Sequence, residues 1–383
     1  MKILVPAVLL VYLSAAMAAI AADISAGPPP TAPDPGASAT SGSRPANPTS
    51  APKPVPPLVH PRGVAVDGDG LLYVVDYVNA LVYKLTPQGR LSVLAEGAGP
   101  GDNFLRPDSL TVDKDKNVYL ADTANSVIRK ISSDGKVITL AGKVTHDQKI
   151  GVDGKGDLAK FDIPTSIAVD AAGNLYVTDN YSCVVRKVTP DGTVTTLAGK
   201  PGDPGSIDGR GAEVRFGKPR GVAVDAAGVV YVADESYHTI RKIAPDGLVT
   251  TLAGNPNYEA GNLDGVGTAA YFAAPRDLVV DAKGNVYVAD TDNHTIRKIT
   301  PQGVVTTFAG TAGLAGFVDG KGANARFNLP RGIAADKDGN IFVADSENAA
   351  IRKITPDGVV TTIYKGGPSS PIMQNGALNF NPP

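Results

Sequence analysis

An aspartate and an arginine recur seven residues apart in five segments of the chain. Each Asp ends a short apolar run and each Arg lies in the next run, so a hairpin would place both side chains on one face of a sheet, roughly diagonal to each other. We expect structural ion pairs, partly buried where one sheet covers the next, because a reaction site would not recur in nearly every repeat. The pairs are Asp122–Arg129, Asp179–Arg186, Asp234–Arg241, Asp290–Arg297 and Asp345–Arg352.

A second recurrent position follows a proline and predicts a ligand-binding site. The residue after this Pro is most often arginine, and it leads into the first strand of each repeat. If the repeats surround one axis, these side chains form a mostly cationic collar that can bind a carboxylate or a phosphate. The alternative is that the arginines pair with loop acids such as Glu235, Asp292 and Glu347. The collar residues are Arg62, Asp108, Thr165, Arg220, Arg276 and Arg331.

The histidines and the single cysteine do not predict a metal site. His238 and His294 occupy the same position in adjacent repeats, and Cys183 occupies it in the repeat before them. In a ring, these third-strand positions would lie roughly 10 Å apart or more, whereas zinc ligands lie about 2 Å from one ion. We therefore predict neither a metal nor a cofactor. A calcium site built from side chains of several repeats would leave no local motif, so the sequence leaves that alternative open.

A longer motif, which we call the insert, precedes four of the repeats. It reads Asp-Gly-x-Gly, then Phe, then Pro three residues after the Phe. We interpret Asp-Gly as a tight turn and the Phe as a plug between neighbouring units. The carboxylates are too sparse for a calcium loop, and no helix follows that would favour a phosphate loop. The aromatic residues are Phe161, Phe216, Phe272 and Phe327.

The elements that position these residues are short strands. Residues 275–310 contain four runs rich in Val, Ile, Thr and Tyr, separated by turns with Gly, Asn and Pro, as in an antiparallel meander. The pattern starts again at intervals of 46 to 57 residues. Six copies predict an all-β fold, a six-bladed β-propeller with four antiparallel strands per blade. We assign it to residues 58–365. The repeats start at Pro61, Pro107, Pro164, Pro219, Pro275 and Pro330.

The repeat resembles the NHL family of six-bladed propellers. The resemblance rests on Asp-x-x-Asn followed by a strand ending in Ile-Arg-Lys-Ile, as in Asp290, Asn293 and Arg297. Ser182 and Tyr237 replace the Asn in two repeats, and Tyr83 replaces the Arg in the first. The resemblance covers residues 58–365 and implies the fold. It leaves the function open, because members of the family bind proteins or RNA, sense ligands or catalyse lyase reactions.

The remaining segments predict export. Residues 1–22 contain a Lys followed by an apolar run that ends in small residues, as in a signal peptide; an uncleaved anchor is the alternative. Residues 23–57 are rich in Pro, Ala and Ser and predict a disordered linker. The tail, residues 366–383, repeats the spacing from Phe to Pro, so we expect Phe380 to pack between the last and first blades.

These observations predict an exported, non-catalytic binding module. The net charge of −2 and the lack of a basic stripe argue against nucleic acid as a partner. We expect a monomer in the periplasm or outside the cell, without a membrane span once the signal peptide is removed. Its ligand would be a protein, a peptide or a small molecule on the face of the insert loops. The alternative is a lactonase- or lyase-type enzyme that uses the channel mouth of the same face.

Overall fold

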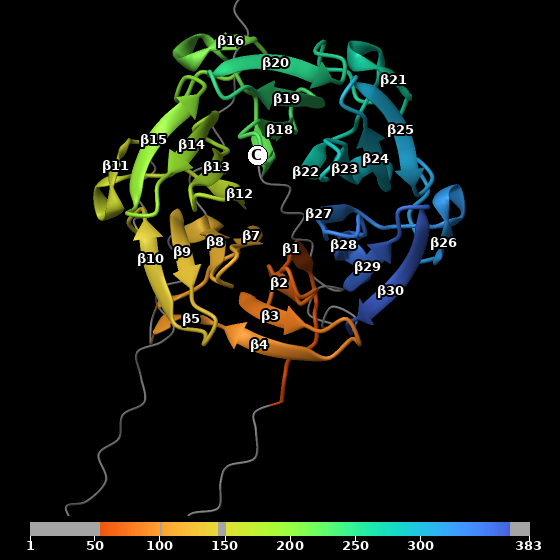
Figure 1. Cartoon of the computed structure of the whole chain (residues 1–383), viewed down its shortest axis with the longest axis horizontal. Coiled ribbons are helices and arrows are strands. Elements are labelled where there is room, and N and C mark those ends of the chain that lie inside the picture. Colours follow the sequence, from red (N-terminus) through yellow and green to blue (C-terminus); the bar gives the residue numbers. More distant parts are fainter. Residues whose placement is uncertain (1–53, 100–101, 145–150, 368–383) are drawn as a thin grey trace, which may run out of the picture. The chain divides into compact units, whose positions relative to one another are not determined.

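The computed structural model describes residues 54–99, 102–144 and 151–367, which form a ring of six β-sheets around a central channel (Figure 1). The predicted all-β, six-bladed propeller is therefore confirmed. The predicted signal peptide, nearly all of the linker and Phe380 lie outside the described residues. Within the described part of the chain, no helix is long and apolar enough to cross a membrane.

Each of the first three blades contains four consecutive antiparallel strands, ordered from the channel to the rim. Blade one consists of β1 (Pro61–Val66), β2 (Leu72–Asp76), β3 (Leu81–Leu85) and β4 (Leu91–Ala95). Blade two consists of β7 (Ser109–Val112), β8 (Val118–Asp122), β9 (Val127–Ile131) and β10 (Val137–Ala141). Blade three consists of β12 (Pro164–Val169), β13 (Leu175–Asp179), β14 (Val184–Val188) and β15 (Thr193–Ala198).

The other three blades repeat this order. Blade four consists of β17 (Pro219–Val224), β18 (Val230–Asp234), β19 (Thr239–Ile243) and β20 (Leu248–Ala253). Blade five consists of β22 (Pro275–Val280), β23 (Val286–Asp290), β24 (Thr295–Ile299) and β25 (Val304–Ala309). Blade six consists of β27 (Pro330–Ala335), β28 (Ile341–Asp345), β29 (Ala350–Ile354) and β30 (Val359–Lys365).

The inserts add a short fifth strand at the rim of blades three to six. In blade four, for example, Gly209 pairs with Val249 of the outermost strand. A 3-10 turn follows each of these strands and leads back toward the next inner strand. The prediction of Asp-Gly as only a turn was therefore incomplete, because its Gly also extends the sheet. The added strands are β11 (Gly154–Lys155), β16 (Gly209–Arg210), β21 (Gly265–Val266) and β26 (Gly320–Lys321).

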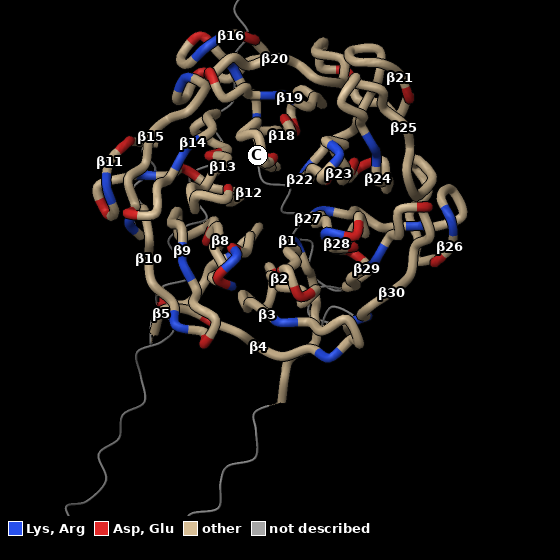
Figure 2. Tube along the Cα trace, in the orientation of Figure 1, with Lys and Arg blue, Asp and Glu red and all other residues tan. Residues whose placement is uncertain are grey.

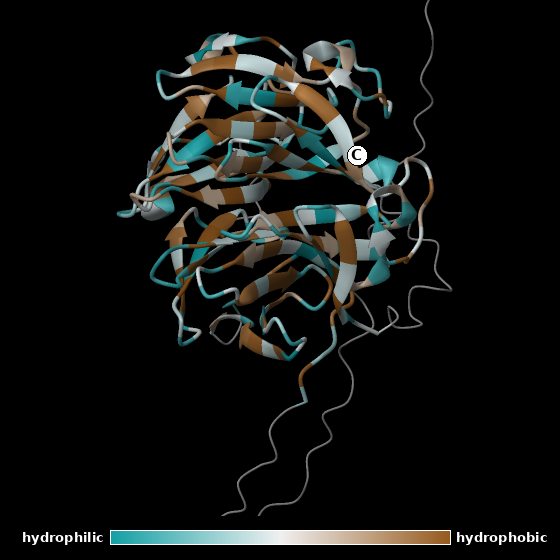
Figure 3. Cartoon of the chain, turned by 45° about the vertical axis from the view of Figure 1, so that its right-hand side comes forward, coloured by the Kyte–Doolittle hydropathy of each residue, from teal (hydrophilic) through white to brown (hydrophobic). Residues whose placement is uncertain are grey.

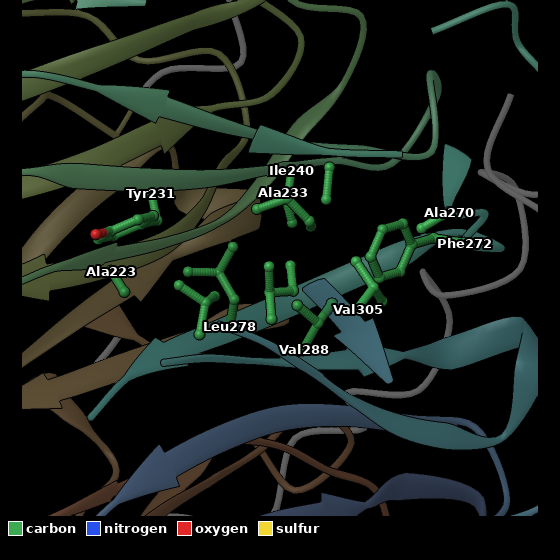
Figure 4. Close-up of a cluster of buried hydrophobic side chains, with 12 residues drawn as sticks. Ala223, Tyr231, Ala233, Ile240, Ala270, Phe272, Leu278, Val288 and Val305 are labelled. Carbon is green, nitrogen blue, oxygen red and sulfur yellow. The ribbon is translucent and has the colours of Figure 1, made fainter. Parts of the chain in front are cut away.

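The hydrophobic core lies between neighbouring blades. Figure 4 shows one such cluster, in which Ile240 of blade four, Val288 of blade five and the insert residue Phe272 are all fully buried. Hydrophobic segments recur along the strands of every visible blade (Figure 3). The four insert phenylalanines are between 0% and 5% exposed. Burial of a Phe contributes on the order of 2–3 kcal/mol, so each insert stabilises the seam that it covers.

The seam between blades six and one closes the ring without exchange of a strand. Leu58 is fully buried there and packs with residues of both blades. Ser346 of blade six donates a 2.6 Å hydrogen bond to the carbonyl of Pro61 in blade one. Leu58 thus occupies the place that an insert Phe takes at four of the other seams.

Candidate ligand-binding site

The recurrent Asp and Arg residues meet inside the blades. Arg297 Nη1 lies 2.9 Å from Asp290 Oδ2, and the two side chains are 1% and 0% exposed. Equivalent contacts of 2.7 to 3.0 Å occur in blades two, three and six. The pairs are fully buried, so the prediction of partial burial was wrong: the neighbouring blade covers the whole sheet face. In blade four, Arg241 and Asp234 are both buried but make no direct hydrogen bond among the described residues.

Each buried arginine also contacts a carboxylate that sequence reasoning missed. Arg297 Nη2 lies 2.7 Å from Asp264, the Asp of the insert, whose side chain is half-exposed. In blades three to six this Asp precedes the Arg by 33 residues. This constant spacing in the sequence could have predicted the contact. The insert Asp therefore fixes the insert to its blade. The five missed carboxylates are Asp102, Asp153, Asp208, Asp264 and Asp319.

The structure brings all six collar residues to one mouth of the channel, around a cavity of about 20 Å³. The inner strands approach so closely there that a Cβ at Gly332 would lie 2.1 Å from the carbonyl oxygen of Arg62. Thr165 is almost fully buried, and its hydroxyl bonds to the Arg220 carbonyl at 3.1 Å, so it supports the backbone. The four arginines of the collar keep their guanidinium groups near the opening, with side chains 14% to 21% exposed.

Two acids at the mouth, one from the collar and one from a loop, are each shared between two arginines. Asp108 lies 2.8 Å from Arg62 and 2.9 Å from Arg220. These arginines hold the pKa of Asp108 below its ordinary value against the opposing effect of burial. Glu235, from the loop between β18 and β19, lies 3.2 Å from Arg220 and 2.9 Å from Arg276. The alternative of pairing with loop acids therefore applies to Arg220 and Arg276, and more weakly to Arg331, which lies 3.7 Å from Glu347.

Arg331 is the least compensated arginine of the collar. Among the described residues, the carboxylate oxygen nearest to Arg331 belongs to Glu347 and is 3.7 Å away. Glu347 makes a closer contact of 2.7 Å with His60. Asp292, the third loop acid considered, makes no ion pair with a collar arginine within the described residues. Burial and the neighbouring guanidinium groups lower the pKa of Arg331 to about 9 and that of Arg276 to about 10. Basic residues lie at the inner ends of β22 and β27 (Figure 2).

Three polar side chains form the boundary between the mouth and the rest of the channel. Ser109, Ser166 and Asp277 line both the mouth cavity and a channel cavity of about 170 Å³. Burial raises the pKa of Asp277 to about 7, although the Ile333 N–H donates to its carboxylate at 3.1 Å. Sequence reasoning missed these residues. The sequence feature that could have revealed them is their shared position in the repeat, two residues after the Pro. The other three blades have Gly at this position.

The family model of the NHL repeat matches residues 216–243, 272–299 and 327–354, which include strands of blades four, five and six. This chain is an NHL-repeat propeller. Among curated proteins it is 36% identical over 148 residues to Protein SUPPRESSOR OF QUENCHING 1 of Arabidopsis thaliana, covering 36% of this chain and 14% of that protein. It is 30% identical over 173 residues to human NHL repeat-containing protein 2, covering 42% and 24% of the two chains. The NHL propeller thus spans a quarter or less of the length of these relatives.

Solved structures share the fold of this NHL propeller at low sequence identity. An auxiliary nutrient binding protein from Bacteroides thetaiotaomicron is 20% identical with a TM-score of 0.58, over 80% of this chain and 70% of that one. A gluconolactonase from Xanthomonas campestris is 14% identical with a TM-score of 0.55, over 80% and 87%. At these identities the likeness shows the propeller architecture alone.

Two histidines of the NHL propeller, His238 and His294, connect neighbouring blades. His238 Nδ1 accepts a hydrogen bond from the Ala274 N–H at 3.1 Å, and His294 Nδ1 accepts one from the Leu329 N–H at 3.1 Å. Cys183, at the same repeat position, is buried. Among the described residues, no three His, Cys, Asp or Glu side chains are grouped so that they could hold a metal ion.

Proposed function

We propose that this NHL propeller is a non-catalytic binding module that holds an anionic group of its ligand at the channel mouth. The observation that carries the proposal is Arg331, a guanidinium group only 14% exposed that has no carboxylate of the described residues within 3.5 Å. A largely buried charge without a close partner is unfavourable, and an anion entering the mouth supplies that partner. Arg276, on the adjacent inner strand, offers a second guanidinium group to the same anion.

The ligand itself is a protein, a peptide or a small molecule that lies on the face of the collar. The loops that carry Glu235 and Glu347 contact the collar arginines and therefore surround the same opening. Export of the protein is part of the proposal and is supported by the apolar run in residues 1–22. A structural neighbour described as a nutrient binding protein supports binding as one use of this architecture.

The competing function is a lactonase- or lyase-type enzyme at the same mouth. Two acids at the mouth are occupied by arginines: Asp108 of the collar contacts two of them, and so does Glu235 of a neighbouring loop. A carboxylate engaged by two guanidinium groups is held ionised and is a weak general base. At Asp108 and Glu235 the mouth thus favours binding of an anion over acid–base catalysis.

The test is binding of small anions by the full chain and by an Arg276→Gln, Arg331→Gln double variant. A panel of sodium acetate, formate, sulfate and phosphate at matched ionic strength is followed by the shift in melting temperature. We expect at least one anion to stabilise the wild-type protein and to lose this effect in the double variant. The control is Arg210→Gln, which changes an exposed rim arginine paired with Asp246. Equal stabilisation of all three proteins would reject a site at the collar.

A further inference from the structure

We infer that the channel mouth is specific for a monoanionic carboxylate and discriminates against sulfate and phosphate dianions. The inference rests on the proposed binding function and names the class of ligand. It is carried by three properties of the mouth: the balance of its charges, the donors that remain without partners, and the size of its cavity.

The charges of the collar leave one positive charge without a counterpart. Four guanidinium groups converge on the mouth, and three carboxylates, Asp108, Glu235 and Glu347, contact them. A monoanion neutralises this difference. A dianion would bring an excess negative charge into a site that already holds Asp108 and Glu235, and like charges close together in a poorly solvated site repel strongly.

The donors without partners lie on adjacent inner strands. The side chain of Arg331 makes no hydrogen bond to any described residue. The guanidinium group of Arg276 contacts the carboxylate of Glu235 through its Nη2 atom. The buried Nε atoms of both arginines also lack a hydrogen-bond partner among the described residues. Two guanidinium groups with free N–H donors match the two oxygens of a carboxylate, because each planar fork can bind them at about 2.7–2.9 Å.

The size of the mouth favours a small terminal group. A cavity of about 20 Å³ holds a group about the size of a water molecule. A planar carboxylate can insert one oxygen edge, while a tetrahedral anion presents further oxygens that find no donors. Ser109, Ser166 and Asp277 close the cavity on the channel side. The rest of the ligand therefore stays on the outer face.

Asp277 makes the affinity depend on pH. It accepts a hydrogen bond from the Ile333 N–H of β27, and it lines the mouth cavity together with Arg276 of its own strand, Arg331 of β27 and Arg220 of β17. Its other neighbours are Asp108 and Ser109 at β7, Thr165 and Ser166 from β12, and Arg62 from β1. Protonated Asp277 adds no charge to the mouth, whereas ionised Asp277 cancels the remaining positive charge. Because its pKa is raised to about 7, carboxylate binding should weaken as the pH rises above that value.

The experiment is saturation-transfer NMR on acetate with the purified full chain, at about pH 6 and about pH 8.5, on either side of the Asp277 titration. We expect a signal at the lower pH that formate displaces and that sulfate, which is a dianion at both pH values, displaces only at roughly tenfold higher concentration. Arg331→Gln should abolish the signal. Arg331→Lys, which keeps the charge, should retain part of it, and Arg210→Gln should leave it unchanged. Asp277→Asn should restore binding at the higher pH.

The outcomes separate the two proposals. Displacement by sulfate at a lower concentration than formate would leave an anion-binding collar but overturn its specificity for carboxylates. Absence of binding by every anion to the folded wild-type protein would overturn both proposals. Acetate binding that is unchanged in Arg331→Gln and Arg331→Lys, with circular dichroism confirming that both are folded, would place the site elsewhere and also overturn the inference.

Discussion

At the scale of single residues, the mouth of the channel differs from the rest of the ring because its polar side chains are not repeated. Three blades place Gly at the position two after the inner Pro, and the others place Ser109, Ser166 and Asp277 there. A Cβ at Gly221 would lie 2.6 Å from the Cα of Asp277, so the strands leave little space for side chains. Asp277 is consequently a carboxyl group in a crowded, poorly hydrated place, which explains its raised pKa.

The raised pKa of Asp277 predicts how its replacement alters stability with pH. An acid with a higher pKa in the folded state binds its proton more tightly there, so its contribution is fully present below the unfolded pKa and is lost as the pH rises toward 7. Asp277→Asn should therefore gain stability over the wild type between about pH 4 and pH 8, by on the order of 4 kcal/mol. Urea unfolding of both proteins across this range measures the difference. A difference that does not vary with pH would contradict the assignment.

At the scale of the elements, the insert is joined to its blade by ionic contacts and not only by its short strand. Arg297 contacts Asp290 of its own sheet and Asp264 of the insert, and the Phe272 ring lies 5.1 Å from its guanidinium group. Thr307 of the outer strand also donates to Asp264, from its N–H and its hydroxyl. One arginine thus connects two strands and the insert.

This arrangement predicts that loss of the buried Arg297 side chain lowers the stability of the protein more than loss of the half-exposed Asp264 side chain. Arg297→Ala leaves the buried carboxylate of Asp290 without its cationic partner and should destabilise the protein by about 3–5 kcal/mol. Asp264→Ala removes a half-exposed carboxylate and should cost less, about 1.5–3 kcal/mol. Guanidinium unfolding gives both values. Hydrogen exchange should show faster opening of residues 264–272 in Asp264→Ala than in the wild type. An Arg297→Ala protein as stable as the wild type would disprove the structural role.

The sequence predicted the strands more completely than the side-chain contacts between them. The strands follow from recurrent Val, Ile and Tyr runs, and the convergence of the collar follows from arginines at one position of each repeat. The pairings within the collar did not follow, because Asp108 bridges to arginines 46 and 112 residues away, which a linear pattern does not encode. The hydrogen bonds of His238 and His294 across the seams did not follow from the sequence either, because both residues adopt a left-handed backbone conformation there.

At the scale of the whole ring, the seam between blades six and one depends on a few noncovalent contacts. Leu58 supplies the apolar plug at this seam, while Leu158, in the 3-10 turn after β11, is 71% exposed. The predicted packing of Phe380 at the same seam lies outside the described residues and stays a prediction.

The two leucines provide a matched test of ring closure. Leu58→Ala should lower stability by about 2–5 kcal/mol because it leaves a cavity at the closing seam. Leu158→Ala should change stability by less than about 0.5 kcal/mol, as expected for an exposed site. Thermal and urea unfolding of both variants, compared with the wild type, measure the effect. Equal stabilities of the two variants would show that the seam does not depend on Leu58.

The close approach of Leu58 and Gly366 has a consequence for the order in which the blades can follow one another along the chain. A Cβ at Gly366 would lie 2.0 Å from the carbonyl oxygen of Leu58, so the first and last residues of the ring are neighbours in space. A short peptide joining them would span almost no distance, and the chain could be opened instead at the connection between two other blades. The ring should therefore tolerate circular permutation, with each blade in turn able to be the first that is synthesised.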